Sequence, residues 1–103
     1  MGGDLSPERL LLAYSRGIFP WFSSDEPILW WAPDPRAILE PSEFIVSKSF
    51  GKSLKKRGYR LSLNKEFSSV VRACAAPRPS QEGTWILPSM ISAYSALHRL
   101  GYA

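Results

Sequence analysis

Residues 17–35 constrain the fold more than any other stretch, because they combine several prolines with large aromatic rings. They read GIFPWFSSDEPILWWAPDP. The four prolines in this stretch fix the backbone angle φ and remove amide donors, so a long helix cannot run through it. Large rings on a stiff, irregular backbone suit either a bracket within the core or a stacking surface for a flat ligand. The stretch alone leaves both interpretations open.

Length and composition restrict the class of protein. The chain has 103 residues, enough for one small domain with a limited core. Its single cysteine, Cys74, excludes an internal disulfide, and with a single histidine a structural zinc site is not expected. The sequence shows neither a signal-peptide pattern nor an apolar run long enough for a membrane span. We therefore expect a cytoplasmic protein without a metal or a cofactor.

Periodicity predicts an α+β fold. Helices are expected at 7–16, 48–57, 65–75 and 89–100, strands at 28–31, 37–39 and 59–63, and a loop at 77–83. Ser6, Ser47 and Asn64 are the expected caps of the first three helices. The apolar stripe of the third helix comprises Phe67, Val70, Val71 and Cys74, and that of the last helix Met90, Ala93, Leu97 and Leu100. The strand at 59–63 needs a partner strand, because an isolated strand is not stable.

A stripe of lysines is the sharpest electrostatic feature. No acidic residue lies between Glu43 and Glu66, and Lys48, Lys52, Lys55 and Lys56 fall within one arc of the helix predicted at 48–57. Like charges at i and i+4 repel each other, so a surface helix is usually balanced by acids. The unbalanced stripe favours binding of a phosphate backbone, and a merely soluble helix face remains the alternative. Lysines position a nucleic acid rather than read its bases.

Groups able to catalyse a reaction are scarce. His98 has no serine or cysteine motif beside it, and we expect it to be structural or to face solvent. Cys74 lies on the apolar stripe of its helix, so a buried and inert thiol is expected. Asp25, Glu26 and Asp34 occupy turn positions without the spacing of a carboxylate pair. Chemistry alone predicts a binding surface and no active site.

Three motifs closely resemble the leucyl/phenylalanyl-tRNA–protein transferase family. They are GGDLSPERLLLAYSRGIFPWF, PILWWAPDPRAIL and EGTWI, and the resemblance extends from Gly2 to the end of the chain. It implies an aminoacyltransferase that takes Leu or Phe from Leu-tRNA or Phe-tRNA. The acceptors would be proteins that begin with Arg or Lys, which the N-end rule (N-degron) pathway then degrades. The implied fold is a small N-terminal domain followed by an acetyltransferase-like (GNAT) domain.

The resemblance also implies roles for particular residues. Trp21 would stack on the 3′-terminal adenosine of the aminoacyl-tRNA, with Tyr14 and Trp85 lining the same site. The lysine stripe would hold the tRNA acceptor stem. Residues 1–35 would belong to the N-terminal domain, and residues 36–103 would form the opening β-α-α of the GNAT domain. Most family members mix Arg with Lys in the basic helix, whereas an all-Lys stripe lacks bidentate contacts with phosphate.

The same comparison predicts a fragment. The chain opens almost directly on a helix start and stops after a helix end at Gly101, and the family's catalytic carboxylate belongs to a C-terminal half that is not present. We expect no catalytic residue in this stretch, and therefore an inactive chain when it is isolated. Two other interpretations remain: a non-catalytic module that binds RNA 3′ ends, and a fragment of a GNAT acetyltransferase. The second lacks the usual pyrophosphate-binding glycine loop in this stretch.

Overall fold

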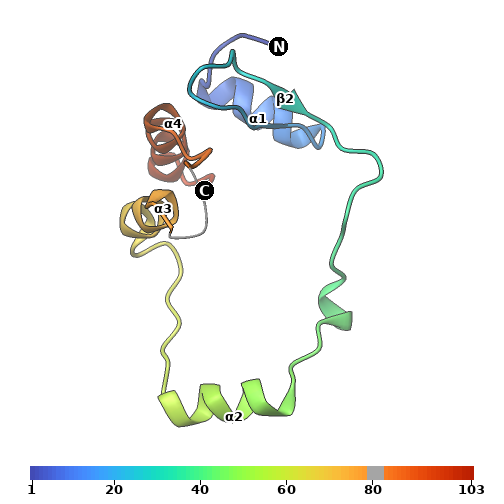
Figure 1. The fold of residues 1–103 in the computed structure, drawn as a ribbon, viewed down its shortest axis with the longest axis vertical. Coiled ribbons are helices and arrows are strands. Elements are labelled where there is room, and N and C mark those ends of the chain that lie inside the picture. The colour runs from blue at the N-terminus through green and yellow to red at the C-terminus, as the bar shows by residue number, and fades with distance from the viewer. Residues whose placement is uncertain (79–82) are drawn as a thin grey trace. The chain divides into compact units, whose positions relative to one another are not determined.

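The computed structural model describes residues 1–78 and 83–103, and Figure 1 shows its elements. In these residues the helices are α1 (Pro7–Ser15), α2 (Lys48–Arg57), α3 (Phe67–Ala75) and α4 (Pro88–Arg99), with a short 3-10 turn η1 at Pro41–Glu43. The strands are β1 (Phe19–Pro20) and β2 (Trp30–Trp31). The chain forms two compact units, residues 1–32 with 64–103 and residues 33–63.

The four predicted helices are confirmed, and their ends differ from the predicted ones by at most two residues. The predicted cap at Ser47 is also confirmed, because its side chain accepts a hydrogen bond from the amide of Phe50 at 3.2 Å. Ser6 occupies the N-cap position of α1 without a side-chain capping bond. Asn64 does not cap α3, since that helix begins later and has Glu66 at its N-cap. Short polar side chains favour helix starts, but the pattern locates the first residue of a helix only to within one or two positions.

Strands β1 and β2 form a small antiparallel hairpin within residues 17–35. Phe19 pairs with Trp31 and Pro20 with Trp30. Beyond the strands, the amide of Trp21 donates a hydrogen bond to the carbonyl of Leu29 at 3.0 Å. The prolines thus permit only two residues in each strand, as expected of a segment that lacks several amide donors.

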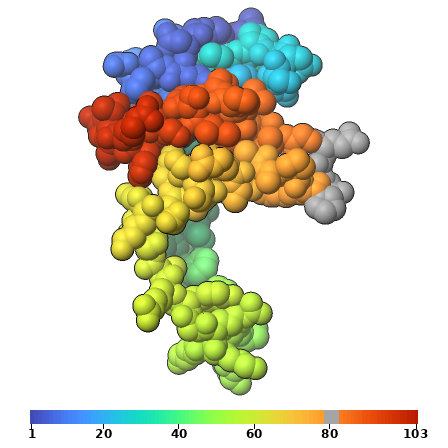
Figure 2. All heavy atoms as spheres, turned by 90° about the vertical axis from the view of Figure 1, so that its left-hand side faces the viewer, coloured from blue at the N-terminus to red at the C-terminus, as the bar shows by residue number. Residues whose placement is uncertain are grey.

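The core of the first unit lies between α1 and α4. Helix α4 packs between α1 and α3, as the red, blue and yellow-orange segments of Figures 1 and 2 show. Leu10 of α1 is fully buried there with Ala93 and Leu97 of α4, and Met90 is also buried. The predicted stripe of α4 is therefore confirmed except for Leu100, which is 58% exposed because it lies beyond the last helical turn.

The second unit, residues 33–63, contains η1 and α2 and buries no side chain. The strands predicted at 37–39 and 59–63 are wrong, because these residues have no strand structure. Their apolar side chains are exposed instead, and Leu61 is 97% exposed. Alternation of apolar and polar residues favours a strand, but the strand also requires a partner to accept its hydrogen bonds.

The two compact units divide the chain differently from the expected domains, and the expected boundary between residues 35 and 36 stays a prediction. Helix α4, expected in the second domain, shares its core with α1 of the first. The loop expected at 77–83 lies partly outside the described residues. Among the helices that the structure describes, none has the length and apolar character needed to cross a lipid bilayer.

Candidate functional site

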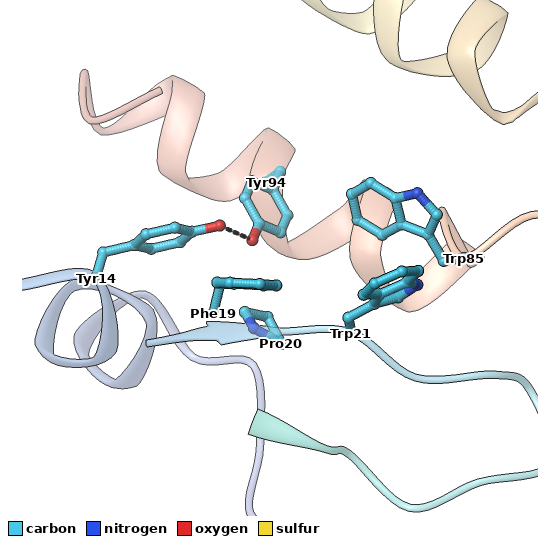
Figure 3. Close-up of a pocket in the computed structure, with 6 residues that line it drawn as sticks. All are labelled: Tyr14, Phe19, Pro20, Trp21, Trp85 and Tyr94. Atoms are coloured by element: carbon cyan, nitrogen blue, oxygen red, sulfur yellow. Dashed lines mark hydrogen bonds between the residues drawn. The ribbon is translucent and has the colours of Figure 1, made fainter. Parts of the chain in front are cut away.

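Six side chains of the first unit line an open pocket of about 190 Å³, which we call the aromatic pocket. It is lined by Tyr14, Phe19, Pro20, Trp21, Trp85 and Tyr94 (Figure 3). These residues come from the end of α1, the strand β1 and its exit, the segment before α4, and α4 itself. The packing of α4 against α1 therefore creates the pocket, because it brings Trp85 and Tyr94 to the hairpin.

Two tyrosines close one end of the pocket. The hydroxyl groups of Tyr14 and Tyr94 are hydrogen-bonded to each other (Figure 3), and the two rings meet edge to face with centroids 6.4 Å apart. Burial, and then the bond with Tyr14, raises the pKa of Tyr94 above its ordinary value of 10.0. Tyr94 therefore keeps its proton at physiological pH, and the two hydroxyl groups can donate and accept hydrogen bonds.

Two tryptophans form the other end. Trp21 follows β1 directly, and Trp85 precedes α4. Their rings meet edge to face at 66° with centroids 6.5 Å apart. Both residues stay exposed in this contact, Trp21 by 53% and Trp85 by 45%. Since aromatic side chains stack on flat rings, the exposed faces of these indoles are able to stack on a flat ligand.

The chemistry of the pocket is that of binding. Its lining residues include no carboxylate, histidine, lysine or arginine, and the described part of the chain contains no cluster of metal-ligating side chains. The cavity is smaller than the roughly 300–1,000 Å³ of typical small-molecule sites. It therefore suits one flat, uncharged ring system, with the tyrosine hydroxyls available as hydrogen-bonding partners.

The structure brings together the three residues that the resemblance places in one site, Tyr14, Trp21 and Trp85. Sequence reasoning missed Tyr94 and did not assign Phe19 or Pro20 to a site. A signal for Tyr94 was present, because it lies four residues after Met90 and next to Ala93, on the apolar side of α4. An aromatic residue with a polar tip at the edge of a buried stripe is a candidate for a pocket wall.

The lysine stripe lies on α2 of the second unit, as predicted. Lys48, Lys52, Lys55 and Lys56 are all exposed, and none of them forms an ion pair with the residues that the structure describes. The capping bond at Ser47 begins the helix, and Gly58 ends it in the left-handed conformation at φ 59°. Both caps are local, so the helix can form although its unit has no buried side chain.

Charge is divided unequally between the two units. Residues 33–63 contain seven basic and three acidic side chains, which accounts for the whole net charge of +4. The remaining residues contain equal numbers of each sign. The positive field of this chain thus originates in the unit that contains the lysine stripe, whereas the aromatic pocket belongs to an electrically balanced unit.

His98 and Cys74, the two other side chains considered for chemistry, lie outside the aromatic pocket. His98 stacks on Phe67 with centroids 4.3 Å apart, and its Nδ1 is hydrogen-bonded to the main-chain oxygen of Ala103 at 2.8 Å, as expected of a structural residue. The buried thiol predicted at Cys74 is wrong, because Cys74 is exposed. It lines an apolar groove of about 230 Å³ between α3 and α4, the α3–α4 groove, which also includes Trp85.

Comparison with known proteins identifies the family. Residues 38–103 match the family described as leucyl/phenylalanyl-tRNA protein transferase. Residues 3–34 match the N-terminal domain of the same family. The two matched ranges together cover nearly the whole chain, including the aromatic pocket and the lysine stripe.

Curated relatives agree with this match. The chain is 57% identical to the leucyl/phenylalanyl-tRNA–protein transferase of Anaeromyxobacter sp. (strain Fw109-5), 58% to that of Nitrosospira multiformis and 60% to that of Enterobacter sp. (strain 638). Each alignment includes all of this chain and 43–44% of the relative. The chain thus spans less than half the length of these relatives. It belongs to the leucyl/phenylalanyl-tRNA–protein transferase family.

Proposed function

We propose that this chain recognises aminoacyl-tRNA in a transferase that moves Leu or Phe to the N-terminal Arg or Lys of an acceptor protein. The observation that carries the proposal is the aromatic pocket, in which Tyr14, Trp21 and Trp85 meet. The family name of the relatives supports the choice of reaction. A cytoplasmic setting and a role in the N-end rule pathway are parts of the same proposal.

The aromatic pocket receives the 3′-terminal adenosine. Trp21 stacks on the adenine ring, and Trp85 meets Trp21 at an angle, so that together they limit how the base can tilt. Stacking of a base on an aromatic side chain contributes about 1–3 kcal/mol, whatever the base. The hydroxyl groups of Tyr14 and Tyr94 lie at the opposite end of the pocket, where they can hydrogen-bond to polar groups of the bound nucleoside.

The lysine stripe holds the acceptor stem through its phosphates. Its four ammonium groups are exposed and have no carboxylate partner among the described residues, so phosphates need not displace an internal ion pair. This contact is independent of sequence and is weakened by salt, because bound phosphates release counterions. The stripe therefore supplies affinity for any tRNA and does not select among tRNAs.

The reaction needs positioning more than activation. The ester that joins the amino acid to the tRNA is already reactive: the acceptor amine attacks the ester carbonyl, a C–N bond forms, and the ribose oxygen leaves with a proton. Orientation of the ester beside the amine supplies much of the acceleration. We propose that the general base belongs to a GNAT-like domain for which this chain provides the opening helices, since the pocket lining contains no carboxylate or histidine.

Binding of a stable analogue tests this function. Tryptophan fluorescence of the 103-residue chain would be followed during titration with 3′-deoxy-3′-phenylalanylaminoadenosine, whose amide resists hydrolysis. We expect quenching that saturates and that is lost in Trp21→Ala. Titration with Phe-tRNA should depend on salt, and the dependence should decrease when the four lysines are replaced by Ala. Unchanged binding in both variants would contradict the proposal.

A module that binds RNA 3′ ends without catalysis is the second candidate. The uncharged pocket and the lysine stripe together favour it, because neither feature requires a reaction. The two candidates differ in their response to the amino acid. A preference for Phe-tRNA over the same tRNA without its amino acid supports the transferase, whereas equal affinity supports the module. Binding of coenzyme A would instead support an acetyltransferase.

A further inference from the structure

The indole of Trp31 holds the backbone of Trp21. Its Nε1 donates a hydrogen bond to the carbonyl oxygen of Trp21 at 2.7 Å. Trp31 lies in β2 and is 48% exposed, so it is not a core residue. Trp31 does not line the aromatic pocket, and its hydrogen bond to Trp21 connects it to a residue that does.

Its neighbour Trp30 has a different partner. The Nε1 of Trp30 donates to the carbonyl of Gly2 at 3.0 Å, and its ring packs against the core around Leu10. Successive residues of a strand point to opposite faces, so the two indoles act on different parts of the unit. Trp30 anchors the N-terminal segment, and Trp31 anchors the exit from β1.

The amide and the carbonyl of Trp21 thus both form hydrogen bonds with residues on the β2 side of the hairpin. Its amide donates to the carbonyl of Leu29 at 3.0 Å, and its carbonyl accepts from Trp31. The preceding residue, Pro20, is fully buried and has a fixed φ angle. The backbone of Trp21 is therefore fixed on three sides, although its ring is half exposed.

We propose that Trp31 is a positioning residue, which keeps Trp21 in its stacking orientation without touching the ligand. The inference depends on the proposed function, in which Trp21 stacks on adenosine. A free loop would have to order Trp21 each time a base binds, and this loss of conformational freedom would weaken binding. The hydrogen bond from Trp31 imposes the order beforehand, as a supporting contact does around other binding sites.

The test removes the N–H group of residue 31 and keeps the rest of the side chain. In one variant, 3-benzothienylalanine replaces Trp31, so that sulfur takes the place of the N–H in a ring of similar shape. A second variant is Trp31→Phe. The matched control is Trp30→Phe, which removes an indole N–H that bonds to Gly2 instead. Each protein would be titrated with 3′-deoxy-3′-phenylalanylaminoadenosine well below its unfolding temperature.

We expect both changes at position 31 to weaken binding by about two- to tenfold, the range for one lost hydrogen bond. The carbonyl ¹³C resonance of Trp21 should shift in the same variants, which a general loss of stability would not produce. Trp30→Phe should lower the midpoint of thermal unfolding and leave the affinity of the folded protein unchanged.

The outcomes separate the two proposals. If the unmodified chain does not bind the analogue, the proposed function fails and the role of Trp31 fails with it. If the unmodified chain binds and the variants at position 31 bind equally well, the role of Trp31 is overturned while the proposed function stands. Equal weakening by Trp30→Phe would also overturn it, because the effect would then be general.

Discussion

The rings of Trp21 and Trp85 meet at 66° with their centroids 6.5 Å apart, although one follows the hairpin and the other precedes the last helix. This contact joins the two halves of the aromatic pocket. It depends on the packing of α4 against α1, so the aromatic pocket and the core form together.

Replacement of Trp21 should abolish stacking. Trp21→Ala is expected to weaken binding of 3′-deoxy-3′-phenylalanylaminoadenosine by about 1–3 kcal/mol, because one base loses its aromatic partner. Trp21→Phe should recover part of the affinity, since it retains an aromatic face. Calorimetric titration measures both. A Trp21→Ala variant that binds as well as Trp21→Phe would show that the ring itself does not contact the base.

Replacement of the lysine stripe should change the dependence on salt. Changing Lys48, Lys52 and Lys55 to Ala is expected to weaken Phe-tRNA binding at low salt and to reduce the slope of log K against log[salt] by up to about 3. Alanine favours helices, so α2 should persist.

The matched control removes Lys65, Arg72 and Arg99, three positive charges of the other unit. It alters the net charge equally and should change the slope less. Equal slopes in the two triple variants would indicate a general charge effect rather than a site on α2.

Replacement of Leu10 tests the link between core and pocket. Leu10 is fully buried between α1 and α4, and Leu10→Ala is expected to lower the free energy of unfolding by about 2–5 kcal/mol. Leu12→Ala in the same helix is the control, because Leu12 is exposed. Denaturant unfolding compares the two. A similar loss in both would contradict the burial of Leu10.

The tyrosine pair predicts a dependence on alkaline pH. Burial and the bond with Tyr14 raise the pKa of Tyr94 in the folded chain above 10.0. The unfolded chain therefore loses this proton first as the pH rises. The contribution of Tyr94 to the free energy of unfolding is fully present below pH 10.0 and decreases from there toward the pKa of the folded state. Tyr94→Phe should make the decrease shallower. Urea unfolding across this range, with the exposed Tyr102→Phe as the control, provides the measurement.

The isolated chain should bind aminoacyl-tRNA without transferring the amino acid. The pocket lining contains no carboxylate or histidine that could accept a proton from the attacking amine. Transfer of radiolabelled phenylalanine from Phe-tRNA to a peptide that begins with Arg is the assay. Product above the level without protein would contradict this expectation.

The sequence predicted well where local signals sufficed. Helix α2 has the predicted ends because its caps, Ser47 and Gly58, adjoin it in the chain. The stripe of α4 was found from its periodicity, since Met90, Ala93 and Leu97 recur at helical spacing. The three predicted aromatic residues of the site share one pocket, but that grouping came from the resemblance to a family.

What the sequence could not predict depends on partners far away in the chain. Residues 59–63 alternate as a strand does, yet they find no neighbouring strand among the described residues. Cys74 lies on an apolar stripe that is not covered, so a helical pattern alone gave it the wrong burial. The hydrogen bond from Trp31 to Trp21 follows from the register of the hairpin, which alternation alone does not specify.

Trp85 lines both the aromatic pocket and the α3–α4 groove, and this affects how any substitution there is interpreted. Trp85→Ala would enlarge both the aromatic pocket and the α3–α4 groove. A change in affinity caused by the pocket could then not be separated from a loss of stability caused by the groove. A change of Phe67 or Met90, on the groove side, would also alter the support behind the same indole. Trp21 lines the pocket without lining the groove, so it is the cleaner position at which to separate recognition from packing.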